Sequence, residues 1–325
     1  TLTGEASVNH EQATAYTDAG ATVTDTVDTS VEVVTAGTVD IATAGIYTLT
    51  YSATDSAGNE ATAVTRAVTV ADTIAPVIAL TGAGSISHEQ GTIYTDEGAS
   101  ATDSVDGSVS VTTTGTVDVT TAETYTLTYT ATDSAGNVAT ATRTVIVTDS
   151  AAPTITLIGA SSINHEQGTS YTDEGASASD IADGSVSVTT TGTVDTTTAG
   201  TYTLTYSATD SAGNAATVVT RTVIVADTIA PVITLSGSAS VNHEQGTTYT
   251  DDGASATDSL DGSVSVTTSG TVNSNAAGTY TLTYSATDAA GNAATAVTRT
   301  VIVADTVAPV ITLSGSASVN HEQGT

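Results

Sequence analysis

The strongest constraint on the fold is a repeat of 77 or 78 residues that runs through the whole chain. The prolines, the arginines and the histidines all recur with these steps, the histidines at 10, 88, 165, 243 and 321. A unit of this length is too long for a solenoid repeat that needs its neighbours, and it suits a small independent domain. We therefore predict four domains and the opening of a fifth, with bounds at 1–73, 74–150, 151–228, 229–306 and 307–325.

Within each unit, apolar residues alternate with polar ones, which is the pattern of half-buried β-strands. In TYTLTYT, residues 124–130, the side chains of Tyr125, Leu127 and Tyr129 share one face and threonines occupy the other. Gly, Asn and Asp turns separate such runs, and SAGN at 134–137 predicts a hairpin. The second unit therefore predicts an all-β sandwich, with strands at about 76–81, 85–90, 98–103, 108–114, 116–120, 124–131 and 139–147.

The composition limits the possible partners and stabilising devices. The chain has 35 acidic and four basic side chains, so its formal net charge is −31, which argues against binding nucleic acid or an anionic membrane. No apolar run is long enough to span a membrane directly. The absence of Cys excludes disulfides, and the absence of Lys excludes Lys–Asn isopeptide crosslinks. By elimination, divalent cations remain as a stabiliser, and they would also relieve the acidic repulsion.

Several short motifs occur together in the units, namely Y-T-D-x-G-A, D-x-x-D-G, G-x-Y-x-x-x-Y, D-x-x-G-N and D-x-x-A-P. As a set they resemble the bacterial immunoglobulin-like repeats, close to the hyalin-repeat type, that occur in tandem in large surface adhesins. The resemblance implies a tandem array of immunoglobulin-like β-sandwich domains that forms an extended extracellular rod, with calcium frequent between the domains of related stalks. The first unit departs from the pattern at Ala19 and Thr29, so it is expected to bind metal less well.

The aspartates near the unit boundaries form the candidate metal site. In a seven-stranded sandwich, the linker and the loops 103–107 and 133–137 meet at one pole. Hard carboxylate oxygens in that number suit Ca²⁺, although Asp is also favoured in ordinary turns. The predicted sets are Asp72, Asp103, Asp106 and Asp133; Asp149, Asp180, Asp183 and Asp210; and Asp227, Asp258, Asp261 and Asp288. A second candidate site consists of the acidic pairs Asp96–Glu97, Asp173–Glu174 and Asp251–Asp252.

All five histidines lie in one motif, HEQGT at 88–92, 165–169, 243–247 and 321–325, and HEQAT at 10–14. A catalytic base oriented by the Glu is one interpretation, but no Ser or Cys nucleophile accompanies it. A transition-metal site is another, but adjacent side chains of a strand point to opposite faces. The third interpretation is a surface strand before a Gly turn, with the His hydrogen-bonded to a neighbouring loop. We predict the third, and no catalytic residues.

Each unit also has a single Arg and three Tyr. Arg143 shares its parity with inward-facing valines, so we expect it to extend out at the end of the sandwich and pair with an acid, with an anionic ligand as the alternative. Tyr125 and Tyr129 are expected in the core with their hydroxyls at its edge, the alternative being a platform on which sugars stack.

These observations predict the structural stalk of an extracellular bacterial adhesin or surface filament, with calcium stiffening the junctions, and no enzyme. The expected partners are neighbouring repeats of the same chain and, in a fibre, other copies, while the sequence does not identify a glycan or surface ligand. One alternative is a self-assembling fibre subunit, in which the opening strands at 307–325 complete the sheet of a neighbour. Another is a carbohydrate-binding accessory region of a secreted enzyme, which requires an exposed row of aromatic side chains.

Overall fold

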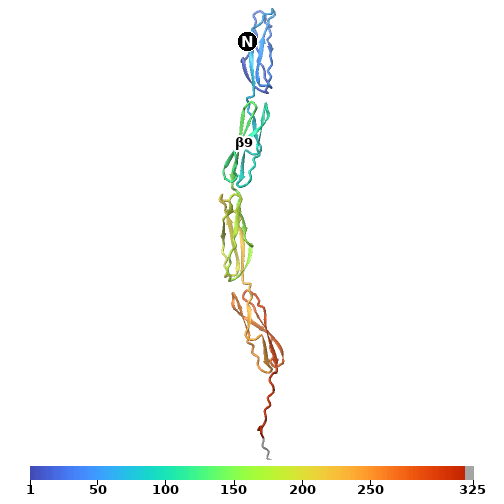
Figure 1. The fold of residues 1–325 in the computed structure, drawn as a ribbon, viewed down its shortest axis with the longest axis vertical. Helices are drawn as coiled ribbons and strands as arrows, with labels where there is room; N and C mark the ends of the chain where they lie inside the picture. Colours follow the sequence, from blue (N-terminus) through green and yellow to red (C-terminus); the bar gives the residue numbers. More distant parts are fainter. Residues whose placement is uncertain (319–325) are drawn as a thin grey trace, which may run out of the picture. The chain divides into compact units, whose positions relative to one another are not determined.

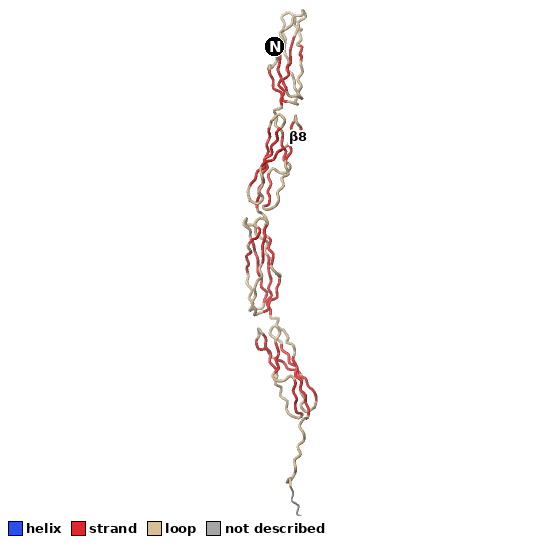
Figure 2. Tube along the Cα trace, in the orientation of Figure 1, coloured by secondary structure: helices blue, strands red, loops and turns tan. Residues whose placement is uncertain are grey.

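The computed structural model describes residues 1–318, which contain strands and turns but no helix (Figures 1 and 2). The HEQGT copy at 321–325 lies outside the described residues, as does the end of the predicted fifth unit. In the part that is described, no helix can cross a membrane. By its contacts the chain divides into two compact units. The first contains Thr1–Ala152, Asp180–Gly184 and Asp210–Asn214, and the second contains Pro153–Ser179, Ser185–Thr209 and Ala215–Thr325.

The strands recur in the same order in the second, third and fourth repeats, while the first repeat has fewer of them (Figure 2, red). The first repeat has β1 (Ser7–Glu11), β2 (Val34–Ala36), β3 (Gly45–Ser52) and β4 (Val64–Ala71). The second has β5 (Val77–Leu80), β6 (Ser85–Glu89), β7 (Ala99–Asp103), β8 (Gly107–Val109), β9 (Val111–Thr114), β10 (Thr124–Thr132) and β11 (Val138–Thr148). The third has β12 (Thr154–Leu157), β13 (Ser162–Glu166), β14 (Ala176–Asp180), β15 (Gly184–Val186), β16 (Val188–Thr191), β17 (Gly200–Ala208) and β18 (Val219–Ala226). The fourth has β19 (Val232–Leu235), β20 (Ser240–Glu244), β21 (Ala254–Asp258), β22 (Gly262–Val264), β23 (Val266–Ser269), β24 (Gly278–Ala286) and β25 (Val297–Ala304).

Two sheets form each of the second, third and fourth repeats. In the second repeat a three-stranded sheet has the order β5-β7-β8, and a four-stranded sheet has the order β6-β11-β10-β9. β6 runs parallel to β11, and the other pairs are antiparallel. The first repeat keeps the four-stranded sheet β1-β4-β3-β2, and an isolated bridge between Leu2 and Ala21 replaces the ladder of the second sheet. The predicted all-β tandem domains are therefore confirmed, while the extended rod stays a prediction.

The predicted strand pattern is wrong at two places in the second repeat. The run expected as one strand at 108–114 is divided, because the chain leaves β8 in one sheet and enters β9 in the other across Ser110. The run expected as a strand at 116–120 forms an extended segment and a turn instead. There Asp118 accepts hydrogen bonds from the backbone N–H and the hydroxyl of Thr120, at 2.9 and 2.7 Å, and this local bonding competes with a ladder.

The core lies between the two sheets and follows the alternation of the sequence. In β10, Leu127, Tyr129 and Ala131 are buried, while the threonines between them are partly or fully exposed. Val145 and Val147 of β11 are buried beside them in the same sheet, and Ala101 of β7 comes from the opposite sheet. Burying each large apolar side chain contributes about 2 kcal/mol to folding.

One spacing between repeats, from His88 to His165, is 77 residues instead of 78, and the second repeat shows where the residue is missing. There β10 and β11 pair without interruption from Thr124 opposite Ile146 to Thr132 opposite Val138. In the third repeat the ladder stops at Tyr206 opposite Val219 and resumes as a bridge between Thr209 and Ala215, one residue out of register. The first and fourth repeats show the same offset. The missing residue of the second repeat thus removes a β-bulge and leaves the domain intact.

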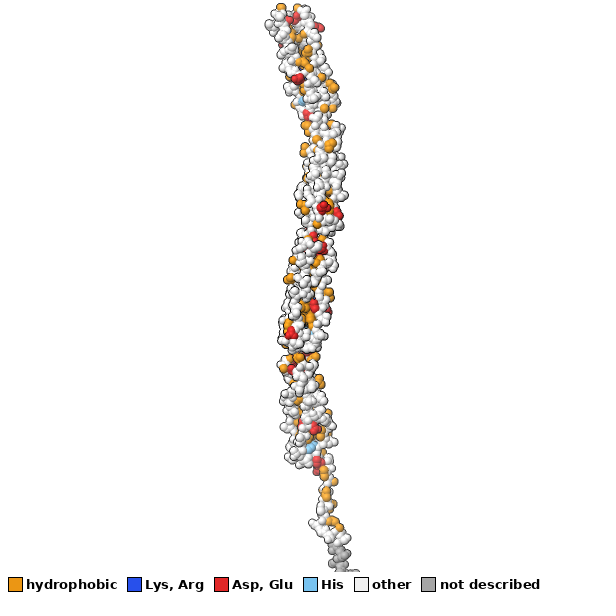
Figure 3. Space-filling view, turned by 90° about the vertical axis from the view of Figure 1, so that its left-hand side faces the viewer, with side chains coloured by type: hydrophobic (Ala, Val, Ile, Leu, Met, Phe, Trp, Pro, Cys, Tyr) orange, Lys and Arg blue, Asp and Glu red, His pale blue; other side chains and the backbone are white. Residues whose placement is uncertain are grey.

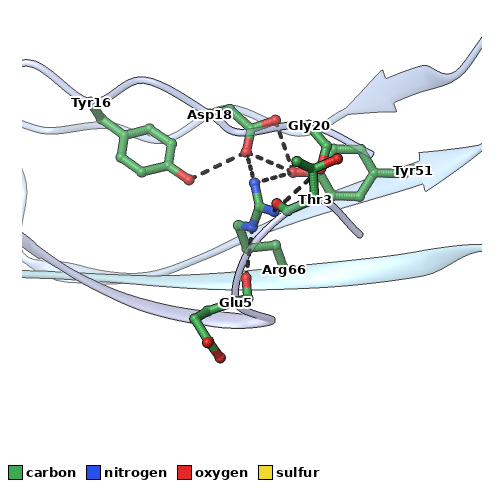
Figure 4. Close-up of polar contacts among 7 residues, drawn as sticks. All are labelled: Thr3, Glu5, Tyr16, Asp18, Gly20, Tyr51 and Arg66. Atoms are coloured by element: carbon green, nitrogen blue, oxygen red, sulfur yellow. Dashed lines mark hydrogen bonds and ion pairs between the residues drawn. The ribbon is translucent and has the colours of Figure 1, made fainter. Parts of the chain in front are cut away.

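The arginine of each repeat is buried inside the sandwich, so the prediction that its guanidinium extends outward is wrong. Figure 4 shows this site in the first repeat, where Arg66 pairs with Asp18. Its guanidinium also donates to the backbone oxygens of Thr3, Glu5 and Gly20, the last two at 2.9 and 3.2 Å. The hydroxyl of Tyr51 donates to the same carboxylate at 2.8 Å. A buried cation with this many acceptors stays solvated by the protein, which is why the core tolerates it.

The other three arginines repeat this arrangement, and all four have an exposed fraction of 0 or 1%. The pairs are Arg143–Asp96, Arg221–Asp173 and Arg299–Asp251. Since the chain has no Lys, the described residues expose no Lys or Arg side chain, and none is visible on the face in Figure 3. Four acids are paired with Arg, and the remaining acids have no Lys or Arg side chain near them on the surface. Dissolved ions must therefore screen the repulsion between these remaining acids.

Candidate metal centre

Three groups of aspartates lie where one repeat follows another. In each group one carboxylate oxygen per residue lies within 4.8 Å of the others. The first group contains Asp72 of the linker, Asp103 at the end of β7 and Asp133 after β10. The other two groups are Asp149, Asp180 and Asp210, and Asp227, Asp258 and Asp288. Each group belongs to one compact unit, the first two to the first unit and the third to the second.

Backbone and amide donors hold these carboxylates in place. Asp103 accepts hydrogen bonds from the N–H groups of Val105 and Asp106 through Oδ1, at 2.7 and 3.1 Å. Asp133 accepts from the N–H and the side-chain amide of Asn137, at 2.7 and 2.9 Å. That amide also lies 3.3 Å from the backbone oxygen of Asp72, so it ties the linker to the loop. These hydrogen bonds occupy some of the acceptor positions of the two carboxylates and fix the direction in which the other acceptor positions point.

Several oxygens of the groups are buried and have no hydrogen-bond partner. They are Oδ2 of Asp72, Asp103, Asp227 and Asp258, and both carboxylate oxygens of Asp149. Asp72 has an exposed fraction of 9% and Asp227 of 8%. Buried charged oxygens without a partner destabilise a fold, and such oxygens in native proteins are commonly satisfied by water or an ion. Three converging carboxylates with free, hard oxygens match the ligand chemistry of Ca²⁺, which also accepts backbone carbonyls and water.

Not every predicted ligand joins the groups. Asp106 accepts hydrogen bonds from the N–H and the hydroxyl of Ser134, at 2.6 and 2.7 Å, and so connects the two loops. Asp183 does the same with Ser211, and Asp261 accepts from the N–H of Ala289. These three residues position the loops, and they lie outside the groups of converging oxygens in the described residues.

The second predicted site is also arranged differently. Asp96, Asp173 and Asp251 pair with the buried arginines of their own repeats. Their partners Glu97, Glu174 and Asp252 are exposed and lie close to Gly82, Gly159 and Gly237. No group of three acids forms around these pairs among residues 1–318.

The first repeat has aspartates at the equivalent loop positions, Asp25, Asp28 and Asp55. Asp25 and Asp55 accept hydrogen bonds within their own turns, and Asp28 accepts one from the N–H of Ser56 in the other loop at 3.0 Å. Within the described chain they do not form a group of three converging oxygens. The expectation of weaker metal binding in this repeat stays a prediction.

The His and Glu of the HEQGT motif have separate roles. His88 Nε2 lies 3.2 Å from the oxygen of Thr92 in its own turn, and its ring meets that of Tyr94 edge-on, with 5.3 Å between the centroids. The hydrogen bond therefore closes the turn, whereas the sequence led us to expect a neighbouring loop. Glu89 instead accepts hydrogen bonds from the N–H groups of Ser150 and Ala151 in the following linker, at 3.0 and 3.2 Å. This Glu contact could not be predicted from the sequence, because its partners are about 60 residues away.

The environment shifts the pKa values of the grouped carboxyls in opposite directions. Burial raises the pKa of Asp72, and the negative charges of Asp103 and Asp133 raise it further. Burial and the neighbouring carboxylates act in the same way on Asp149 and Asp227. Backbone hydrogen bonds from Asp106 and Val105 instead hold the pKa of Asp103 below its ordinary value. The linker aspartate of each group therefore takes up a proton more readily than a free Asp side chain when no cation is present.

Without divalent ions, we expect the stability of the chain to rise at first as the pH falls from 7, and then to decrease at lower pH. Raised pKa values make the folded chain bind protons more readily, so stability rises as the pH falls from 7 through the folded pKa values of Asp72, Asp149 and Asp227. Below the unfolded Asp pKa of about 3.9, stability falls, because acids with lowered pKa values must be protonated. Calorimetric melting in EDTA should therefore peak at mildly acidic pH. A melting temperature that falls steadily from pH 7 downward would contradict this.

Four segments of the chain match a known protein family. The family described as "Bacterial surface protein, Ig-like domain" matches residues 1–70, 78–147, 155–225 and 233–303. The chain belongs to this family. The matched segments lie one in each of the four predicted repeats, although the exact domain bounds stay predictions. A comparison with curated proteins found no match.

Solved structures with similar folds include animal and bacterial proteins. "Protocadherin Gamma B2 extracellular cadherin domains 3-6" is 15% identical, with 92% of this chain and 98% of that chain covered and a TM-score of 0.31. Drosophila N-cadherin EC1-4 is 16% identical, with coverages of 79% and 83% and a TM-score of 0.24. A CBM51-2 and INT domain structure from Clostridium perfringens ZmpB is 22% identical over 26% of this chain and 20% of that chain, with a TM-score of 0.20. Similarities at this level carry no functional inference.

Proposed function

We propose that this surface-protein chain is an extracellular structural spacer whose successive repeats are joined by calcium. The observation that supports the metal is the convergence of three carboxylates, with buried oxygens that lack a partner, at each of three junctions. A cation at this position would bind the linker and two loops of the following repeat at once. It would neutralise their mutual repulsion and restrict the linker, and both effects stiffen the junction.

The surface gives little support to a sugar-binding role. All twelve tyrosines are buried or partly buried, and none is fully exposed. Tyr129 lies in the core with its hydroxyl on Asp96 at 2.7 Å, and the partly buried Tyr125 donates to the backbone oxygen of Thr121 at 3.1 Å. The described part of the chain therefore has no exposed row of aromatic rings. Residues 307–318, the described part of the fifth unit, form no strand in this chain, and the strand-complementation alternative stays a prediction.

Calcium titration tests this proposal. We expect calorimetry to show three weak sites, with dissociation constants of about 10⁻⁴ to 10⁻³ M, as in other extracellular calcium modules. Calcium should also raise the melting temperature, because it binds only the folded junction. Asp149→Asn should remove one of the three sites, since both oxygens of this carboxylate lack other partners.

The matched control is Asp118→Asn, which changes an acid that accepts hydrogen bonds within its own exposed turn. It should keep all three sites. Identical melting curves in calcium and in EDTA would refute the calcium junction. An unchanged stoichiometry in Asp149→Asn would refute the assignment of that ligand.

A further inference from the structure

The HEQGT motif of the second repeat contacts the linker that leaves this repeat. The Glu89 carboxylate accepts hydrogen bonds from two consecutive backbone N–H groups, those of Ser150 and Ala151, and from the Ser150 hydroxyl. Glu11, Glu166 and Glu244 accept from the backbone N–H and the hydroxyl of Thr73, Thr228 and Thr306, without a second N–H group. In every case the bound residue directly follows the linker aspartate. In the first three repeats that aspartate is Asp72, Asp149 or Asp227, so the Glu fixes the chain beside a proposed metal ligand.

At the second junction this contact determines what the aspartate can do. Asp72 and Asp227 use Oδ1 to accept the N–H of the isoleucine two residues later, at 3.3 and 3.2 Å. At Asp149 the corresponding N–H belongs to Ala151 and goes to Glu89 instead, at 3.2 Å. Both oxygens of Asp149 are left without a partner. Glu89 therefore leaves the Asp149 carboxylate free to bind an ion with two oxygens.

The glycine of the same motif lies against the loop that supplies another aspartate. Gly91 has a φ of 78°, and a Cβ atom placed on it would lie 2.7 Å from the backbone oxygen of Ile181. Ile181 directly follows Asp180, and all of these residues belong to the first compact unit. Because the contact is with backbone, a side chain at position 91 cannot be accommodated by a rotamer change. The loop itself would have to move.

The remaining residues of the motif make its turn rigid. His88 Nε2 lies 3.2 Å from the backbone oxygen of Thr92, and the Thr92 hydroxyl donates to the backbone oxygen of Glu89 at 2.7 Å. The Gln90 side chain donates to the oxygen of Thr120 at 2.9 Å, and the Gly91 N–H donates to that of Val119 at 2.8 Å. The turn is therefore held from both sides before any ion binds.

We propose that HEQGT is a docking surface for the aspartate loop of the following repeat. Its Glu fixes the linker next to one metal ligand, and its Gly seats the loop that carries a second. The docking contact needs no ion, while its role in arranging the metal ligands rests on the proposed calcium function. The partner of this surface is thus the D-x-x-D-G loop of the next repeat in the same chain.

The other repeats support a graded version of this device. In the second compact unit a Cβ on Gly168 would lie 3.3 Å from Leu260 Cδ1, a side-chain atom that can move. In the first repeat the position is Ala13, with a φ of 58°. At Gly246, which has a φ of 83°, the described residues place nothing within 4 Å. Among the three glycines at this position, Gly91 thus has the closest contact with a following loop, and Gly246 offers a turn without a docked loop.

Distance measurements across the second junction test the docking. The chain has no Cys, so Thr126→Cys and Thr203→Cys, both exposed positions in the second and third repeats, allow specific spin labelling of the full chain. We expect one narrow distance distribution by pulsed EPR in EDTA, and a narrower one in calcium. Gly91→Ala and Glu89→Gln should each broaden it under both conditions.

Gly246→Ala is the control for strain, because it places Ala in the same backbone conformation where no loop docks. Its effect on the stability of the fourth repeat should equal that of Gly91→Ala on the second, and it should leave the distribution narrow. A wild-type distribution in Gly91→Ala and Glu89→Gln overturns the docking, whatever calcium does. If calcium does not change the wild-type distance distribution while both variants broaden it, the calcium junction is overturned and the docking stands.

Discussion

Trypsin should leave the folded chain intact, although the same chain is cut at four sites after denaturation. The chain has no Lys, and Arg66, Arg143, Arg221 and Arg299 are at most 1% exposed. Each lies within a strand that pairs on both sides, so a protease can reach it only when its repeat unfolds. With an unfolded fraction of about 10⁻³ or less, cleavage should slow by about a thousandfold or more relative to the denatured chain.

The fragments identify which repeat has opened, because each repeat contains one arginine. The measurement is the cleavage rate of native and urea-denatured chain, followed by mass spectrometry. A protease that cuts after Glu is the control, since Glu60 and Glu123 are exposed and near turns. Rapid tryptic cleavage of the native chain at any of the four sites would contradict the burial of that arginine.

Asp96→Ala should destabilise the second repeat by about 3 kcal/mol or more, since it leaves a buried guanidinium without its counter-ion. Arg143 is fully buried and Asp96 is 24% exposed, so the carboxylate is the partly hydrated half of the pair. The carboxylate also accepts the Tyr129 hydroxyl at 2.7 Å, which would lose this partner. Burial raises the pKa of Asp96, but hydrogen bonds from Tyr129 and Arg143 outweigh it and leave that pKa below its ordinary value.

Tryptic cleavage at Arg143 measures this loss directly. It should accelerate by about a hundredfold for 3 kcal/mol, while cleavage at Arg66, Arg221 and Arg299 stays at the wild-type rate. Glu123→Ala removes an exposed acid from the same repeat and should change none of the four rates. Equal acceleration at all four sites in Asp96→Ala would show that the repeats do not unfold independently.

The sequence alone was sufficient for features that follow from local pattern. The repeat length indicated tandem units, and the alternation in TYTLTYT correctly placed Leu127 and Tyr129 in the core. This alternation could be read from the sequence because the strand period depends on neighbouring residues. The topology of a seven-stranded sandwich also predicted that linker and loop aspartates converge, and Asp72, Asp103 and Asp133 lie together, while the domain bounds and the metal ligands stay predictions.

Only the tertiary structure decided the features that join distant residues. Parity placed Arg143 on the inward face, but its burial required Asp96, Tyr129 and backbone oxygens of the loop between β5 and β6 to surround it. Similarly, Asp106 bonds Ser134, and Glu89 bonds Ser150, at separations of 28 and 61 residues. Acidic residues look alike in a sequence. The fold alone decides whether the partner of each one is a guanidinium, a hydroxyl or the backbone of the linker to the next repeat.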